Sequence, residues 1–227
     1  MNNQAQLAPA DAADLAGDLA LLIERLGSTD GLIASGDTGW LLGCSRIESL
    51  ESLRTFLDNY RAQMLEMREF PTILQAWRHA SRAEARELIE LDRRLAAEPS
   101  LQPFAQASLL AGRHQLRRLR PLRDERVVQR YLAALETGQA NGWHTVVYGV
   151  TLAIYSLPPR QGLLEYARQT LNGFAQSAGR RLAIAEADWI AAAEKACAPL
   201  SAVVNELVDA CSQSPFVGAE TAAERSG

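Results

Sequence analysis

The stretch Gly142-Trp143-His144-Thr145-Val146-Val147-Tyr148-Gly149 decides the fold, together with the apolar run that follows it to Leu157. The run is too hydrophobic for an exposed surface and too short to cross a membrane, which takes about 20 apolar residues. A histidine stands at its start, and the glycine before it allows the chain to turn. The pattern therefore predicts a buried element that is entered through a glycine turn.

The composition is that of an ordinary folded protein. The chain has 227 residues, of which 48% are hydrophobic and 22% are charged, and this is enough to build a sizeable core. A net charge of −4 offers no general attraction to nucleic acid or to an anionic membrane. Lys195 is the only lysine, so no glycine-rich phosphate-binding loop is present. The three cysteines, Cys44, Cys197 and Cys211, follow no metal-ligand spacing, and we expect reduced thiols in a cytoplasmic protein.

Almost every segment has the spacing of an amphipathic helix. Between Ile47 and Met67 apolar side chains recur at steps of three or four, which predicts one buried stripe that ends at Pro71. Ser81 and Glu84 have the spacing of a capping box that opens the next helix. Further helices are expected from Ser100 or Pro103, from Val127 to near Gly138, at about 144–156, 159–181 and 183–196, and from Pro199.

No alternating run is long enough to build a sheet, so the predicted fold class is all-α. We expect a single compact helical domain of about nine or ten helices over residues 19–211. Residues 1–18 are rich in Ala, Pro, Asn and Gln and predict a flexible N-terminal arm. Residues 212–227 are small and polar apart from Phe216 and Val217, which predicts a tail that a partner orders.

The candidate catalytic and metal-binding patterns are weak. Asp37-Thr38-Gly39 matches the tripeptide of aspartic proteases, but a second copy and a β-rich frame are missing, so we interpret it as part of a loop from Ser35 to Gly43. His79, His114 and His144 lie far apart in the sequence and show no ligand spacing. We therefore predict no catalytic residue and no metal ligand, and we interpret His144 as a residue at a helix start or an interface.

Arginines gather between residues 113 and 130. Arg113, Arg117 and Arg120 share a helix face by their spacing. Three interpretations stay open: a solvated face, a patch that docks an acidic partner, and a surface for RNA. Aromatic residues that could stack on bases do not interleave with these arginines, which favours the acidic partner over the RNA.

Four motifs, in order along residues 19–226, resemble the urease accessory protein F (UreF) family. The clearest is Gly-x-His-x-Val-Val-Tyr-Gly at 142–149, with the following helix and the Leu157-Pro158-Pro159 turn. Leu91-Asp92 and the run from Ala107-Ser108 to Gly112-Arg113 resemble the family's Leu-Asp stretch and its Glu-Ala-Ser…Gly-Arg helix, with Gln106 in place of the glutamate. Ser35-Gly36 stands at the family's Phe-Pro-Ser/Thr-Gly-Gly-Phe loop, and Glu220-Thr221 with Arg225 has the spacing of its Glu-Thr-Gln-Tyr-Ser-Arg end. At 183–188, where the family has a Gly-Gln-Thr-x-Gly-Gln turn, this chain reads Ala-Ile-Ala-Glu-Ala-Asp, which predicts helix.

The resemblance implies a urease maturation scaffold that is not an enzyme. UreF proteins dimerise and bridge the scaffold protein UreD (also called UreH) to the GTPase UreG, and so control GTP-dependent nickel insertion into apo-urease. On this basis no cofactor is expected on this chain, because nickel and GTP are handled by the partners. The residues expected to matter are Phe216, Glu220, Thr221 and Arg225 for the UreD-like partner, Ser35, Gly36 and Asp37 for the GTPase, and His144, Tyr148 and Gly149 for the core or the dimer interface.

Two other functions remain open from the sequence. One is a helical adaptor or chaperone for a different metalloenzyme or protein client, which the divergent loops favour. The other is a helical enzyme that uses His144 with a carboxylate, which would need a concave pocket around that histidine.

Overall fold

The computed structural model describes residues 47–119 and 125–213, and within these ranges every regular element is helical. This confirms the all-α class. The elements are α3 (Leu50–Tyr60), the π-helix η1 (Arg61–Glu69), α4 (Phe70–Ser81), α5 (Ala85–Ala96), the 3₁₀-helix η2 (Pro99–Phe104), α6 (Ala105–Leu119), α7 (Arg126–Glu136), α8 (His144–Ile154), α9 (Pro159–Leu182), α10 (Glu186–Cys197) and α11 (Leu200–Gln213).

Several of these elements join end to end. The elements α3, η1 and α4 form one continuous rod, η2 leads directly into α6, and only Ala198 and Pro199 separate α10 from α11. Counted as rods, the described residues form seven helices, slightly fewer than the nine or ten expected. Helix α11 ends at Gln213, past the predicted domain boundary at residue 211.

The π-helix changes which side of the long rod is buried. In η1 the hydrogen bonds reach back five residues, as when the N–H of Phe70 donates to the carbonyl of Leu65. This wider turn buries Leu65 and Glu69, whereas Met67 is 73% exposed. The prediction of one stripe through Met67 was therefore wrong beyond Met64. Pro71 lies in the first turn of α4 but does not break the rod, because the π turn makes room before a residue that has no N–H to donate.

Two predicted helix boundaries were also wrong. Ser81 is the last residue of α4, where its hydroxyl donates to the carbonyl of Trp77, so it does not cap α5. Glu84 instead contacts Nδ1 of His79 at 2.7 Å, after a turn in which Ala83 has a φ of 58°. At the end of α9 the chain turns at Ala183, which has a φ of 53°. Residues 183–185 thus form a turn, where the sequence pattern predicts helix.

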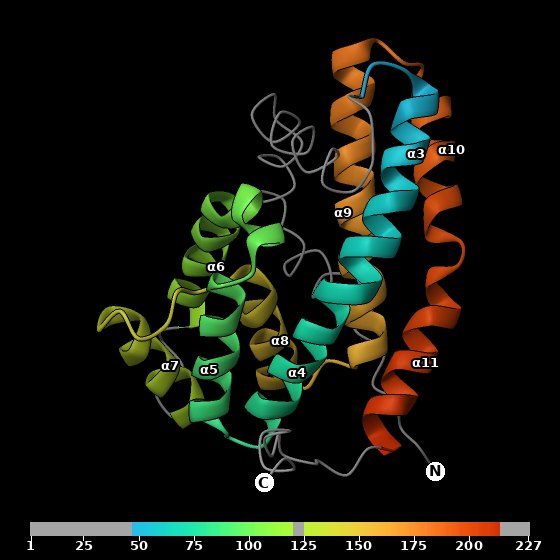
Figure 1. Ribbon diagram of the computed structural model, residues 1–227. Coiled ribbons are helices and arrows are strands. Elements are labelled where there is room, and N and C mark those ends of the chain that lie inside the picture. Colours follow the sequence, from blue (N-terminus) through green and yellow to red (C-terminus); the bar gives the residue numbers. More distant parts are fainter. Residues whose placement is uncertain (1–46, 120–124, 214–227) are drawn as a thin grey trace, which may run out of the picture.

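The helices enclose two hydrophobic cores that meet along α4 and α8. Figure 1 shows α3, α9, α10 and α11 on one side of the molecule and α5, α6 and α7 on the other. The first core contains Phe56, Tyr60, Phe174 and the apolar faces of α10 and α11. The second core is formed by residues of α5, α6 and α7 and by Val146, Val147 and Val150 of α8. Helix α8 contributes to both cores, since its Tyr148 and Leu152 belong to the first.

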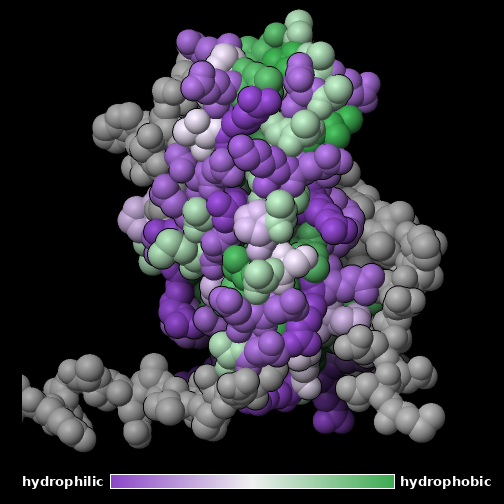
Figure 2. Space-filling view, turned by 90° about the vertical axis from the view of Figure 1, so that its right-hand side faces the viewer, coloured by the Kyte–Doolittle hydropathy of each residue, from purple (hydrophilic) through white to green (hydrophobic). Residues whose placement is uncertain are grey.

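The outer face of the first core is polar. Figure 2 shows the side of α10 and α11 as mainly hydrophilic, with hydrophobic residues gathered at its upper end. Among the helices of the described residues, none is long and apolar enough to span a membrane.

Candidate functional site

Helix α8, the element that the sequence marked most clearly, lies at the centre of the protein. Its residues from His144 to Leu152 are all buried, and it packs most extensively against α4. Gly149 makes this close packing possible, since a Cβ there would lie 2.7 Å from the Cβ of Ala76 and 2.9 Å from the backbone nitrogen of Trp77. The structure therefore places His144, Tyr148 and Gly149 in the interior of a single copy of the chain.

The turn that leads into α8 is held by Asp92 of α5. The backbone N–H groups of Gly142 and Trp143 donate to its Oδ1 at 3.1 and 2.9 Å, and the N–H of Asn141 donates to Oδ2. The hydroxyl of Tyr131 donates to Oδ1 at 2.8 Å. Asp92 is fully buried, and these donors satisfy both of its oxygens. Gly142 has a φ of 85°, which a residue with a side chain rarely adopts.

Helix α6 closes on the same turn from the other side. A Cβ at Gly112 would lie 2.9 Å from the backbone nitrogen of His144 and would also meet the carbonyl of Gly142. The neighbouring Arg113 donates from Nε to the carbonyl of Asn141 at 3.2 Å. The Gly-Arg pair of the sequence motif thus has a structural role, because it lets α6 lie against the entrance of α8.

A chain of buried polar groups starts at His144. Its Nδ1 lies 2.6 Å from the hydroxyl of Ser108, and its Nε2 lies 2.7 Å from the hydroxyl of Tyr166. Burial lowers the pKa of His144 to about 3, so its ring is neutral at physiological pH. A neutral ring has one donor and one acceptor, which fits acceptance from Ser108 and donation to Tyr166.

The chain continues to Glu69 of the π-helix. The hydroxyl of Tyr60 donates to Oε1 of Glu69 at 2.9 Å, and Tyr166 is also hydrogen-bonded to this carboxyl. Burial raises the pKa of Glu69 from 4.5 to about 7, although both phenol hydrogen bonds lower it. Burial also raises the pKa of Tyr60 and Tyr166 well above 10, and the nearby charge of Glu69 adds to this effect. Four helical segments and the π-helix therefore share one buried hydrogen-bonded chain.

The buried chain lies beside a small pocket. The pocket is about 20 Å³ in volume, which is room for about one water molecule. It is lined by Ser108 and His144, among other residues. A serine beside a histidine resembles a nucleophile with its base, but the low pKa of His144 makes it a weak base at neutral pH. The arrangement fits hydrogen bonds that hold α6, α8 and α9 together better than it fits a hydrolytic site.

The other predicted site residues lie partly outside the described residues. Ser35, Gly36 and Asp37 of the loop, and Phe216, Glu220, Thr221 and Arg225 of the tail, belong to these undescribed segments, as does Arg120. Arg113 is described and exposed, whereas the side chain of Arg117 is not described. The prediction that these arginines share one exposed face therefore stays a prediction. Across residues 47–119 and 125–213 no group of three or more His, Cys, Asp or Glu side chains could hold a metal ion.

Sequence reasoning missed the acids and phenols of the interior. The sequence identifies Asp92 and Ser108 only as parts of the family motifs. It assigns no polar role to Glu69, Tyr60 and Tyr166. One signal was available, because a buried tyrosine needs a partner for its hydroxyl. Gln106, where the family motif has glutamate, is exposed, so that difference does not touch the buried chain.

A comparison with family models identifies the group to which the protein belongs. The model described as UreF matches residues 47–189, which is more than half of the chain and includes Asp92, Ser108, the 142–149 turn and Tyr166. The chain belongs to the UreF family. This match confirms the resemblance inferred from the motifs. UreF proteins are urease accessory proteins. No curated protein matches this UreF chain.

Proposed function

We propose that this UreF protein is a non-catalytic scaffold of urease maturation that bridges a UreD-like protein and a UreG-like GTPase. The observation that carries the proposal is the family match over residues 47–189, which covers the second core, the part of the first core that precedes residue 190, and the turn that leads into α8. In this role the protein controls GTP-dependent nickel insertion into apo-urease, and the nickel and the nucleotide stay with its partners. A scaffold can do so by binding one nucleotide state of the GTPase more tightly than the other.

The rigidity of the centre supports a scaffold role. Asp92, Gly112 and Gly149 each hold α8 against a different helix, by hydrogen bonds or by close backbone contact. A rigid interior keeps surface segments at fixed positions, which a bridge between two proteins requires. We further propose that the protein acts as a homodimer.

We assign contact with the UreD-like partner to the tail at residues 214–227. Phe216 provides an apolar anchor, and Arg225 can make a bidentate contact with a carboxylate. A segment of this composition pays an ordering cost on binding, which allows it to be both specific and reversible. The loop with Ser35, Gly36 and Asp37 is proposed to face the GTPase, and the face with Arg113, Arg117 and Arg120 to meet an acidic partner.

Co-purification tests the proposal. The tagged full chain is expressed with the UreD-like and UreG-like proteins of its own source, with GTP and magnesium, and the product is analysed by light scattering. The proposal predicts a ternary complex with two copies of this chain. A species that binds neither partner would contradict it and would favour an adaptor for a different client.

A truncation tests the tail separately. The variant ends after Gln213, so that α11 stays intact. It should keep its helicity by circular dichroism and lose the UreD-like partner in a pull-down. The point variants Phe216→Ala and Arg225→Ala should weaken binding, whereas the matched control Ser226→Ala should not. Undiminished binding by the truncated chain would refute this role of the tail.

A further inference from the structure

Two buried polar atoms beside His144 have no hydrogen-bond partner among the described residues. They are Oε2 of Glu69 and Nε1 of Trp143. Trp143 is 3% exposed and Glu69 is 6% exposed, so neither atom reaches bulk water. A buried polar group without a partner costs about 1–3 kcal/mol, which is why native proteins rarely leave one unpaired.

Both residues line the same pocket, which lies between η1, the start of η2, α6 and the turn into α8. Its wall is completed by Met64, Arg68, Thr72, Leu95, Leu101, Ser108, His144 and Thr145. At about 20 Å³ the pocket has room for about one water-sized molecule and for nothing much larger.

The chemistry of the two atoms restricts the occupant. An indole N–H only donates, and a carboxylate oxygen accepts. An anion would meet the Glu69 carboxylate, and a cation would meet the N–H of Trp143 and the guanidinium of Arg68. A neutral molecule that both accepts and donates a hydrogen bond can satisfy both atoms.

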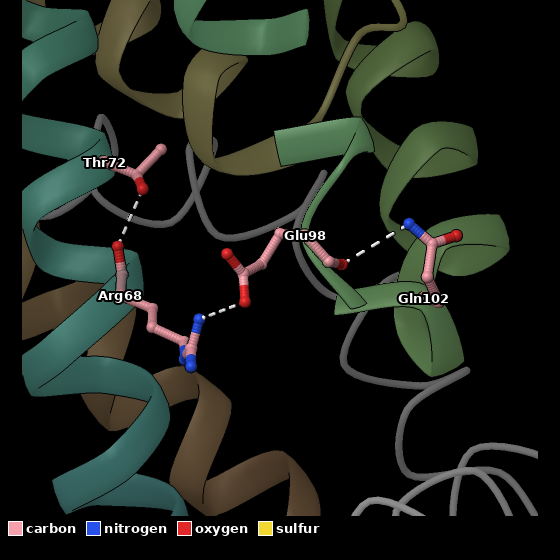
Figure 3. A network of polar contacts seen from close by, with 4 residues as sticks. All are labelled: Arg68, Thr72, Glu98 and Gln102. Atoms are coloured by element: carbon pink, nitrogen blue, oxygen red, sulfur yellow. Dashed lines mark hydrogen bonds and ion pairs between the residues drawn. The ribbon is translucent and has the colours of Figure 1, made fainter. Parts of the chain in front are cut away.

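Arg68 lines this pocket and pairs with Glu98, which follows α5. Nη1 of Arg68 lies 2.7 Å from Oε1 of Glu98, and the two side chains are 41% and 39% exposed. Figure 3 shows the pair reaching from the π-helix to the segment between α5 and η2. The backbone carbonyls of both residues also accept hydrogen bonds, since Thr72 donates to the carbonyl of Arg68 at 2.7 Å and Gln102 donates to the carbonyl of Glu98 at 3.4 Å.

We propose that the pocket is a binding site for one water-sized neutral molecule, which accepts from Nε1–H of Trp143 and donates to Oε2 of Glu69, and that the Arg68–Glu98 pair closes its mouth. Water is the member of this class that is always present. The site completes the hydrogen bonding of the Ser108–His144–Tyr166–Glu69 chain on its open side. We expect that breaking this ion pair exposes the site to solvent, because both side chains are partly exposed.

The occupant is tested first by a high-resolution crystal structure of the full chain. We expect one ordered water within hydrogen-bond distance of both Nε1 of Trp143 and Oε2 of Glu69. In solution, the indole N–H of Trp143, assigned by loss of its signal in Trp143→Phe, should show a cross-peak to long-lived water in a water-selective NMR experiment. A dry or collapsed pocket, or a direct bond from the indole to a protein acceptor, would overturn the proposal.

The mouth is tested by hydrogen exchange at the same indole. Glu98→Gln keeps the size of the side chain and removes the charge, and we expect exchange of the Trp143 N–H to speed up by about tenfold with an unchanged melting temperature. Arg68→Ala should act in the same direction. The control Arg93→Ala removes an exposed arginine of α5 whose nearest carboxylate oxygen, on Glu90, is 3.9 Å away, and it should leave the rate unchanged. Equal exchange rates in all four proteins would refute the closing role of the pair.

Discussion

Among the described residues, two acidic side chains are buried, Glu69 and Asp92, and their surroundings are opposite in kind. Asp92 receives three backbone N–H groups and a tyrosine hydroxyl, so both of its oxygens have partners. Glu69 receives only the hydroxyls of Tyr60 and Tyr166, and its Oε2 has no partner among the described residues. Burial therefore raises the pKa of Glu69 to about 7, near physiological pH.

The contrast separates two tasks within one helical fold. Backbone donors belong to the main chain and cannot rotate away, so Asp92 fixes the turn at 141–143 permanently. Phenol donors sit on side chains from α3 and α9, so the surroundings of Glu69 can adjust to the gain or loss of a proton. One acid is a fixed anchor, and the other is a group whose charge depends on pH.

The largest effect is expected for the anchor. Asp92→Ala leaves three backbone N–H groups and the buried hydroxyl of Tyr131 without their acceptor, and we expect the free energy of unfolding to fall by about 4 kcal/mol. Urea unfolding followed by circular dichroism measures it. The control Glu90→Ala removes an exposed acid from the same helix and should cost less than about 0.5 kcal/mol. Similar losses in the two variants would mean that Asp92 is not an anchor.

A second variant tests the close packing of α8 against α4. Gly149→Val pushes α8 away from Ala76 and Trp77 of α4, and the overpacking should cost about 3 kcal/mol. The control Ala133→Val puts the same side chain on the exposed face of α7 and should cost less than about 1 kcal/mol. Differential scanning calorimetry gives both values. A melting temperature of Gly149→Val equal to that of the control would contradict the close crossing of α4 and α8.

The smallest effect concerns the tuning of Glu69. Tyr60→Phe removes a hydrogen bond that lowers the pKa of this carboxyl, so the pKa should rise above 7. The cost in stability should be about 1 kcal/mol. Carboxyl ¹³C chemical shifts followed against pH measure the pKa directly. Tyr148→Phe is the matched control, because its hydroxyl donates to the carbonyl of Gly162 instead. A fall of the pKa in Tyr60→Phe would show that the phenol does not stabilise the ionised form.

The helices with plain apolar periodicity could be predicted from the sequence. Helices α7, α8 and α9 begin and end close to the expected residues, because Gly138, Gly142 and Pro159 mark their boundaries. The π-helix could not be predicted in this way. A period of 3.6 residues places Met67 on the buried face of the helix and does not place Glu69 there. The Ser81–Glu84 pattern also misled, because the left-handed backbone at Ala83 turns the chain before a capping box can form.

The buried chain of polar groups lies beyond what one sequence reveals. Tyr60, Glu69, Ser108, His144 and Tyr166 come from five different elements, and no spacing links them. Only the packing of α3, η1, α6, α8 and α9 brings them together. His144 was found because it starts an unusually apolar run, but its partners were not. Asp92 was visible as a motif letter, and its role required the turn to be seen in space.

Glu69 takes up a proton near neutral pH in the folded protein, whereas Asp92 is held by backbone donors. Because the pKa of Glu69 rises from 4.5 to about 7 on folding, its protonated form favours the folded state. Its contribution to stability is fully present below pH 4.5 and is lost as the pH rises through about 7. The titratable groups that face it, Tyr60, His144 and Tyr166, are neutral at this pH, and the charged Arg68 lines the same pocket.

The most direct test is the unfolding free energy of the wild-type protein and of Glu69→Gln in urea, measured from pH 4.5 to pH 8. We expect the wild-type protein to lose about 3 kcal/mol relative to the variant over this range, since each unit of pKa shift corresponds to about 1.4 kcal/mol. The loss should centre between the two pKa values of the carboxyl. Parallel curves for the two proteins would mean that Glu69 keeps an ordinary pKa and that the two buried acids do not differ in the way described.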